Sequence, residues 1–361
     1  MKPVRDLAVA MVAGSLAGLG CNSVATESVP NTQGTDRIWA ASNTYCARTS
    51  NGLICWEADA GNVAAHEPTV FDGVGKVRAL ALRNGEGCAI SDLGLGCFRL
   101  SDKQLARGGA EVPSEFVAFG GAKTMHCARG AEGVSCFGDK IEDLKPAPAF
   151  DKPSQLHPTL RGNGTCAEYE YELRCFTTDA DGKLLATLRL RGVRGAKAIR
   201  IDEEKGWVLV LDGSGLKFST ANAEAVRGRA VTEDNAKNFP DTATIELTDV
   251  EGVKVAKKLT ADSTSTYVLD EEGVKSIALS DKGLELQLWP LSFKPTDLWQ
   301  GNGSVFFVAH EGELSMHGWK DGERYGKVLR GVKNPKDVAA GELYTCVVHD
   351  GGISCVKNLL D

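Results

Sequence analysis

Short apolar stretches alternate with turn residues along the whole chain, without a long amphipathic helical period. The stretch Ile38–Ala41 shows the order: it is followed by an apolar arm, a turn rich in Asn and Gly, and another arm. The same order recurs in eight units, anchored near residues 46, 88, 127, 166, 208, 267, 307 and 346. Repeats of about 40 residues with several short strands each are typical of a β-propeller. The pattern therefore predicts an all-β propeller of seven or eight blades.

Ten of the eleven cysteines form five pairs, and both members of every pair are nine positions apart. Residues with this spacing face each other across a hairpin with a two- or four-residue loop. A directly opposed, non-hydrogen-bonded pair has Cα atoms about 4.5 Å apart, which is within disulfide range. Zinc sites usually need closer pairs such as C-x-x-C, which this chain lacks. We therefore predict five intra-repeat disulfides, joining Cys46 to Cys55, Cys88 to Cys97, Cys127 to Cys136, Cys166 to Cys175 and Cys346 to Cys355.

Three of the eight units contain no cysteine and carry Val208, Tyr267 and Phe307 where a first cysteine would fall. We expect these units to be blades held by apolar packing alone. The segment 219–262 breaks the period, because the anchors on either side of it are more widely spaced than the others. It is predicted as an insertion, either a functional loop or longer outer strands with a solvated connection. Four aromatic residues that follow a second cysteine are expected to pack between neighbouring units: Trp56, Phe98, Phe137 and Phe176.

Units one to four and unit eight resemble repeats of the regulator of chromosome condensation family. The resemblance rests on Tyr45-Cys46-Ala47 with Asn51-Gly52-Leu53-Ile54-Cys55-Trp56, and on Ala340-Gly341, Tyr344-Thr345-Cys346 and Asp350-Gly351-Gly352. It extends over 36–361 and is weak in the three cysteine-free units. It implies a seven-bladed propeller, whereas this chain has eight units, so the terminal units would have to combine. The resemblance is used here for the fold and not for chromatin binding or nucleotide exchange, because those members are nuclear.

The N-terminal residues 1–20 have the features of an export signal. Lys2 and Arg5 precede a short apolar segment, which ends before Gly20 and Cys21. Such a segment is too short to span a membrane. It resembles a bacterial lipoprotein signal, which implies that Cys21 is lipidated; the alternative is ordinary cleavage, secretion and a free Cys21 thiol. Residues 21–35 are polar and are predicted to be a flexible tether to the propeller at 36–361.

The net charge and the positions of the His and acidic residues exclude some classes of function. The chain has 41 Lys and Arg against 48 Asp and Glu, a net charge of −7, which argues against a nucleic-acid binder. His310 and His349 occupy matching positions in neighbouring units but have no third ligand, so solvated turn histidines are expected and no metal or cofactor is predicted. Four acidic residues recur at hairpin turns, where we expect them to cap the turn backbone: Asp92, Asp212, Asp270 and Asp350. His126 and His157 have no clear partner in the sequence.

Two functional hypotheses remain. The first is a monomeric binding module, lipid-anchored in the bacterial envelope, that binds a protein or another envelope ligand and has no catalytic activity. The second is a propeller hydrolase or lyase with a site at the mouth of the central channel, assembled from several blades. Clustered His, acid and Arg groups in a concave mouth would favour the enzyme, and a flat aromatic face would favour binding.

Overall fold

The computed structural model describes residues 23–358. The gaps in this range fall at 51, 66, 84, 109–112, 114, 120–124, 139–140, 142–143, 148–149, 151, 161–163, 180–182, 203–204, 221–228, 231–242, 263, 281–282 and 321. The predicted signal at 1–20 and the candidate lipidation residue Cys21 lie outside the described residues. Within those residues no helix has the length and apolar character needed to cross a membrane.

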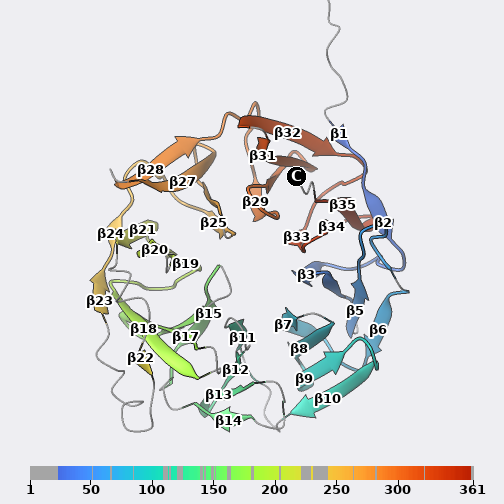
Figure 1. The fold of residues 1–361 in the computed structure, drawn as a ribbon, viewed down its shortest axis with the longest axis horizontal. Helices are drawn as coiled ribbons and strands as arrows, with labels where there is room; N and C mark the ends of the chain where they lie inside the picture. The colour runs from blue at the N-terminus through green and yellow to red at the C-terminus, as the bar shows by residue number, and fades with distance from the viewer. Residues whose placement is uncertain are drawn as a thin grey trace, which may run out of the picture.

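Eight sheets, formed by the described residues, are arranged in a ring around a central axis (Figure 1). Each sheet is one blade with four main antiparallel strands, the first strand innermost and the fourth toward the rim, and two of the sheets carry additional outer strands. This confirms the predicted all-β propeller and sets the blade number at eight instead of the seven implied by the family resemblance.

The strand bounds follow the sequence units. Blade 1 has β3 (Arg37–Ala41), β4 (Thr44–Arg48), β5 (Gly52–Glu57) and β6 (Thr69–Asp72); blade 2 has β7 (Val77–Arg83), β8 (Glu86–Ser91), β9 (Gly94–Arg99) and β10 (Gln104–Gly108). Blade 3 has β11 (Glu115–Phe119), β12 (Met125–Gly130), β13 (Gly133–Phe137) and β14 (Lys145–Pro146); blade 4 has β15 (Gln155–Pro158), β16 (Gly164–Glu168), β17 (Glu172–Thr178) and β18 (Leu184–Arg191).

The second half of the ring repeats this order. Blade 5 has β19 (Ala198–Asp202), β20 (Trp207–Leu211), β21 (Leu216–Thr220) and β24 (Thr248–Asp249); blade 6 has β25 (Lys258–Ala261), β26 (Thr266–Leu269), β27 (Val274–Ser280) and β28 (Gly283–Leu288). Blade 7 has β29 (Asp297–Gln300), β30 (Phe306–His310), β31 (Glu313–Lys320) and β32 (Glu323–Leu329); blade 8 has β33 (Asp337–Ala340), β34 (Tyr344–His349) and β35 (Gly352–Lys357).

The N-terminal segment supplies the missing fourth strand of blade 8. Strand β2 (Glu27–Val29) pairs antiparallel with β35, while β1 (Ser23–Val24) pairs in parallel with β32 of blade 7. The terminal segments therefore combine to close one blade. This differs from the flexible tether predicted for 21–35. These strands are two and three residues long, and only Val29 in them is buried, so their sequence shows no clear alternation.

Each predicted disulfide joins the second and third strands of one blade. In blade 1, Cys46 of β4 and Cys55 of β5 are direct partners in the strand register. The same register pairs the other four couples, with Cα–Cα separations between 3.9 and 4.1 Å. The intra-repeat disulfides expected from the spacing of nine are therefore present, each bridging a hairpin. Five disulfides among the described residues indicate an oxidising, extracytoplasmic environment.

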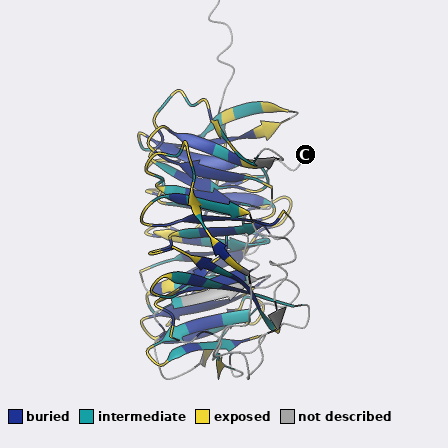
Figure 2. Cartoon of the chain, turned by 90° about the vertical axis from the view of Figure 1, so that its left-hand side faces the viewer, coloured by how far each residue is buried: buried dark blue, intermediate teal, exposed yellow. Residues whose placement is uncertain are grey.

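The apolar core is divided among the interfaces between blades. Eight buried clusters can be distinguished in the described residues, one between each pair of neighbouring blades. Trp56, Phe98, Phe137 and Phe176 each pack in the cluster shared with the preceding blade, as predicted. Val208, Tyr267 and Phe307 of the cysteine-free blades are each at most 1% exposed. Figure 2 shows the ring from the side, with buried residues along the strands.

Part of the predicted insertion at 219–262 extends blade 4. Strands β22 (Arg229–Ala230) and β23 (Ala243–Glu246) both pair with β18, β22 antiparallel and β23 parallel. Strand β24 then forms the rim of blade 5 by pairing with β21. Among the described residues of 219–262, only β22 and β23 are extra outer strands, because β24 and β25 are regular strands of blades 5 and 6. Residues 221–228 and 231–242 lie outside the described residues.

Candidate functional site

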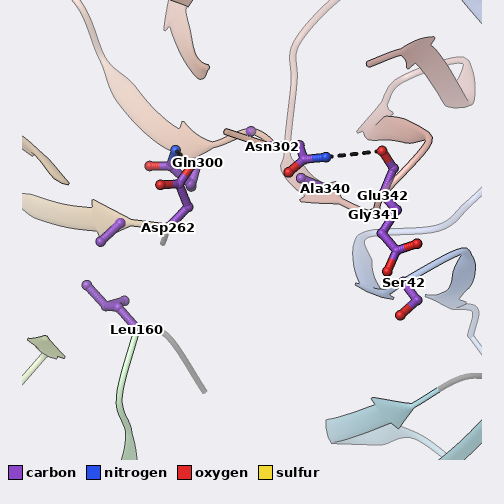
Figure 3. A pocket seen from close by; sticks show the side chains of 10 residues that line it. Ser42, Leu160, Asp262, Gln300, Asn302, Ala340, Gly341 and Glu342 are labelled. Carbon is purple, nitrogen blue, oxygen red and sulfur yellow. Dashed lines mark hydrogen bonds between the residues drawn. The ribbon is translucent and has the colours of Figure 1, made fainter. Parts of the chain in front are cut away.

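A cavity of about 540 Å³ lies at the end of the axis where the innermost strands terminate. We call it the axial cavity. The turns that follow β3, β15, β25, β29 and β33 contribute to its wall, so five blades build it (Figure 3). Its lining is Ser42, Leu160, Ala261, Asp262, Gln300, Gly301, Asn302, Ala340, Gly341 and Glu342.

The carboxylate of Asp262 is fixed by its own turn. One oxygen, Oδ1, accepts the backbone N–H groups of Thr264 and Ser265 at 2.6 and 2.8 Å, and the Thr264 hydroxyl at 2.9 Å. The other oxygen, Oδ2, accepts Gln300 Nε2 at 3.0 Å. A carboxylate that accepts this many hydrogen bonds is held in one orientation.

Gln300 has its amide nitrogen satisfied, whereas its amide oxygen is buried without a partner. Its Nε2 also donates to the carbonyls of Val305 at 2.9 Å and Gly303 at 3.2 Å. Three oxygens around the amide nitrogen fix which way the amide points, because the reversed amide would place oxygen against oxygen. Gln300 Oε1 is then a buried acceptor with no hydrogen-bond partner among the described residues.

A buried arginine supports the Asp262 turn from blade 5. The Arg200 guanidinium donates to the backbone carbonyls of Asp262 and, at 3.2 Å, of Ser265. It also lies 3.7 Å from Asp202 Oδ2 and stacks over the Trp207 ring at 5.0 Å. Because Arg200 is only 2% exposed, it acts as a structural strut and not as a surface charge.

The turn after β33 forms the opposite wall of the axial cavity. Hydrogen bonds to the backbone of Glu342 hold this turn in place. The Glu342 carbonyl accepts Asn302 Nδ2 at 3.1 Å, drawn as a dashed line in Figure 3. The Glu342 N–H donates to the Ser42 carbonyl at 2.7 Å. The Glu342 side chain is exposed and takes part in no hydrogen bond or ion pair with the described residues. The wall therefore offers a carboxylate that is free to meet a ligand.

Tyrosine hydroxyls clasp neighbouring blades close to this wall. Tyr45 of blade 1 donates to the Tyr344 carbonyl of blade 8 at 2.7 Å and accepts the Tyr344 N–H at 3.3 Å. Burial raises the pKa of Tyr45 far above its usual value, so the hydroxyl stays protonated. In blade 6, Tyr267 donates to the Ser304 carbonyl of blade 7 at 3.0 Å, and burial raises its pKa to about 12. Both hydroxyls act as interblade clasps.

The acids at hairpin turns have the predicted capping role in blades 5 and 6. Asp212 Oδ1 accepts the N–H groups of Ser214 and Gly215, and Asp270 Oδ1 accepts those of Glu272 and Gly273. Asp92 Oδ1 accepts the Lys76 N–H in the connection from blade 1 to blade 2, and Asp350 bonds the Asn334 side chain. These acids follow the second strand of their blades, whereas the axial cavity is lined by the turns that follow the first strands. They therefore lie at the other end of the blades and stabilise the fold.

The histidines correct two expectations. His310 and His349 end β30 and β34 at matching positions, as predicted, but both are buried (9% and 7% exposed) and not solvated. The His310 ring stacks on Phe293, while His349 Nε2 bonds Ser354 Oγ at 2.9 Å. Phe293 lies in the connection between β28 and β29, so this connection covers His310. The described residues contain no group of three side chains that could ligate a metal.

His157 has a partner, contrary to the expectation from the sequence. Its Nε2 lies 2.7 Å from Glu168 Oε2, and both residues are buried. The Glu168 carboxylate also accepts the backbone N–H groups of Gly195 and Ala196, which begin blade 5. The sequence could not show this pair, because the register between β15 and β16 brings His157 and Glu168 together. This group belongs to the interface between blades 4 and 5.

Sequence reasoning did not find the residues of the axial cavity. Ser42, Asp262, Gln300 and Glu342 are far apart in the chain and share no motif. They do share a position, because each lies four to seven residues before the anchor of its unit. Aligning the units by their anchors and reading the polar residues just before them would have gathered these four.

Fold and site together define an eight-bladed β-propeller with a polar cavity on its axis. No protein-family model matches the chain, and no curated protein matches it. Three solved structures are similar in fold. They are apo AztD from Citrobacter koseri, PorZ from Porphyromonas gingivalis and Hsv2 from Kluyveromyces lactis.

AztD is 11% identical, with a TM-score of 0.53, and the match covers 83% of this chain and 86% of that chain. PorZ, an essential bacterial surface component of the type-IX secretion system, is 13% identical with a TM-score of 0.51 over 92% of this chain. This chain spans only 38% of the PorZ chain. Hsv2 is 9% identical with a TM-score of 0.50, covering 81% of this chain and 97% of that chain. Identities this low show the fold alone.

Proposed function

We propose that the protein is an extracytoplasmic binding propeller, tethered to a membrane by lipid on Cys21, whose axial cavity receives a cationic side chain of a protein partner. One observation carries the binding role: the exposed Glu342 carboxylate, which has no hydrogen-bond or ion-pair partner among the described residues, lies in the wall of a polar cavity of about 540 Å³. A Lys or Arg side chain that enters the cavity would pair with this carboxylate.

The same geometry favours binding over hydrolysis. A general base must accept a proton from a group within hydrogen-bond reach. The Asp262 carboxylate already accepts three donors from its turn and one from Gln300. Among the described residues that line the cavity, Ser42 has the only hydroxyl, and none is a histidine. The cluster of His, acid and Arg groups that would favour an enzyme is not found in this lining.

Charge reversal combined with photo-crosslinking in cells tests the binding site. A photoreactive amino acid in place of Asn302 lies in the cavity wall. The same amino acid in place of Glu132 lies in an exposed turn between the second and third strands of blade 3, at the other end of the blade. We expect a discrete adduct from position 302 and none from position 132.

Glu342→Lys should abolish the adduct at position 302, since it places a cation against the cation of the partner. The matched control Glu132→Lys makes the same charge change on the other face and should leave the adduct intact. Circular dichroism checks that both variants are folded. Equal adducts from both positions, or an adduct that persists in Glu342→Lys, would contradict the proposed site.

The anchor is tested separately. Cys21→Ser should move the protein from the membrane to the soluble fraction, and the intact mass of the wild type should carry an added lipid. A wild-type mass without lipid, together with unchanged fractionation of the variant, would exclude the tether. It would leave the cavity experiment unaffected.

A further inference from the structure

The rim of blade 7 is basic, although the protein as a whole is acidic. Residues 318–336 contain six Lys and Arg against two Asp and Glu, in a chain with a net charge of −7. Two of the six, Lys333 and Lys336, form ion pairs with Glu313 and Asp350, which leaves four basic residues. This stretch includes the rim strand β32 and its flanking turns. We use the term basic rim for Trp319, Lys320, Arg324, Lys327 and Arg330. Lys320 and Arg330 are exposed, and Lys327 is half-buried.

Exposed apolar side chains accompany these charges. Trp319 is 37% exposed, and Leu288 at the end of β28 is 50% exposed. The Arg324 guanidinium lies between two indoles, 4.8 Å from the Trp289 ring centre and 5.0 Å from that of Trp319. The two indoles meet edge to face, with their centres 5.4 Å apart. Tryptophan beside Arg and Lys is the combination that proteins place at the boundary between lipid and water.

The N-terminal segment reaches the described structure at this rim. Ser23 and Val24 of β1 pair with Val328 and Leu329 of β32, and Arg330 Nε donates to Ser23 Oγ at 2.5 Å. Cys21 precedes Ser23 by two residues. Two residues span at most about 7 Å, so a lipid on Cys21 would be attached within that distance of Ser23 at the basic rim.

We propose that the basic rim docks on an anionic lipid surface, so that the propeller stands edge-on to the membrane. The proposal rests on the lipidation of Cys21 proposed above and adds the orientation of the ring. The occupant is a lipid surface and not an acidic protein, because the candidate lipid attachment point is two residues from the rim strand. Basic side chains near an anionic surface add to a single anchor that binds weakly alone. When the ring stands edge-on, its axis runs parallel to the membrane, so the axial cavity at the end of that axis stays accessible to a partner.

Depth-dependent quenching tests the orientation in the full mature protein, reconstituted in vesicles of phosphatidylcholine and phosphatidylglycerol with nitroxide-labelled lipid. A fluorescent amino acid is encoded in place of Lys327, or in place of Lys145 as the control. Lys145 is an exposed lysine on the rim strand β14 of blade 3, opposite blade 7 in the ring (Figure 1). We expect strong quenching at 327 and little at 145. Equal quenching at both positions, or stronger quenching at 145, would overturn the proposal.

A second measurement uses the unlipidated full chain, Cys21→Ser, and sedimentation with the same vesicles. Each basic residue near an anionic surface contributes about 1 kcal/mol, or about fivefold in binding. Lys320→Gln together with Lys327→Gln should therefore weaken binding about 25-fold, while Lys145→Gln should leave it unchanged. Binding that is insensitive to the double variant, or that is equally strong to pure phosphatidylcholine, would overturn the proposal.

The intact mass of the wild type separates the two proposals. A lipidated protein without quenching at 327 refutes the edge-on orientation but keeps the anchor. An unlipidated protein that still binds anionic vesicles through Lys320 and Lys327 refutes the anchor but supports the basic rim. Capture of an acidic protein through these lysines, without any effect of anionic lipid, also overturns the proposal.

Discussion

Removing one hydroxyl at the seam between blades 1 and 8 should destabilise the whole ring. Tyr45 is fully buried, and its ring stacks on Trp56 with centres 5.6 Å apart. Tyr45→Phe keeps this packing but removes the clasp to the Tyr344 backbone. The Tyr344 carbonyl retains the Gly341 N–H as a donor at 2.9 Å, whereas the Tyr344 N–H loses the Tyr45 oxygen. The main effect is therefore one buried N–H group left without that acceptor.

Such a group costs about 1–3 kcal/mol in the free energy of unfolding. The matched control is Tyr267→Phe in blade 6, which removes a single hydrogen bond to the Ser304 carbonyl. It should cost about 1 kcal/mol, the average contribution of one hydrogen bond. Gly341→Ala offers an independent route to the seam, because an added Cβ would collide with the Tyr45 hydroxyl and the Ser42 carbonyl.

The assay is urea unfolding without reductant, followed by tryptophan fluorescence, together with hydrogen exchange. Tyr45→Phe should lower the midpoint more than Tyr267→Phe does. Amides of β2, β3 and β33 should lose protection first, because these strands meet at the seam. If Tyr45→Phe is as stable as the wild type, or if protection falls equally in blades 3 and 4, the clasp does not hold the ring closed.

Three further predictions concern packing, protonation and cross-links. Phe307→Ala in blade 7 should cost about 3–5 kcal/mol in urea unfolding, because the ring is 1% exposed; a loss under about 1 kcal/mol would mean that the site collapses around the gap. Burial lowers the pKa of His317 from 6.5 to about 4, so the unfolded chain takes up the proton first. Stability should be full above pH 6.5 and fall as the pH drops toward 4, and His317→Gln should lack that slope. Peptide mapping without reduction should find the five cysteine pairs of spacing nine, and a dominant bridge between Cys55 and Cys88 would disprove the hairpin register.

The sequence predicted the repeating part of the fold because each blade carries its own signals. The spacing from Cys46 to Cys55 determines a hairpin, and a hairpin is a local structure. Tyr267 and Phe307 revealed cysteine-free blades because they occupy the same buried position in the unit. The closing strand β2 was missed because three residues with a single buried side chain show no periodicity.

The site could not be predicted in the same way, because it has no local signature. Asp262 and Gln300 come from neighbouring blades and meet only after the ring closes. The unpaired oxygen of Gln300 follows from three hydrogen bonds of its amide nitrogen, and the spacing of residues in the sequence reveals none of these bonds. The buried pair of His157 and Glu168 was hidden for the same reason, since strand register creates it.

The use of β2 as the rim of blade 8 has a consequence for the order in which the protein can mature. Each cysteine hairpin closes over a loop of about ten residues, so it can form as soon as it emerges into an oxidising compartment. Residues 27–29 emerge before every blade but have no partner until Ile353–Cys355 arrive. Strand β2 therefore waits for β35, the last strand to emerge, and the edge of blade 8 stays open until the two strands pair. Truncation near the C-terminus should trap a chain with its early bridges formed and its ring open, a natural target for chaperones and proteases.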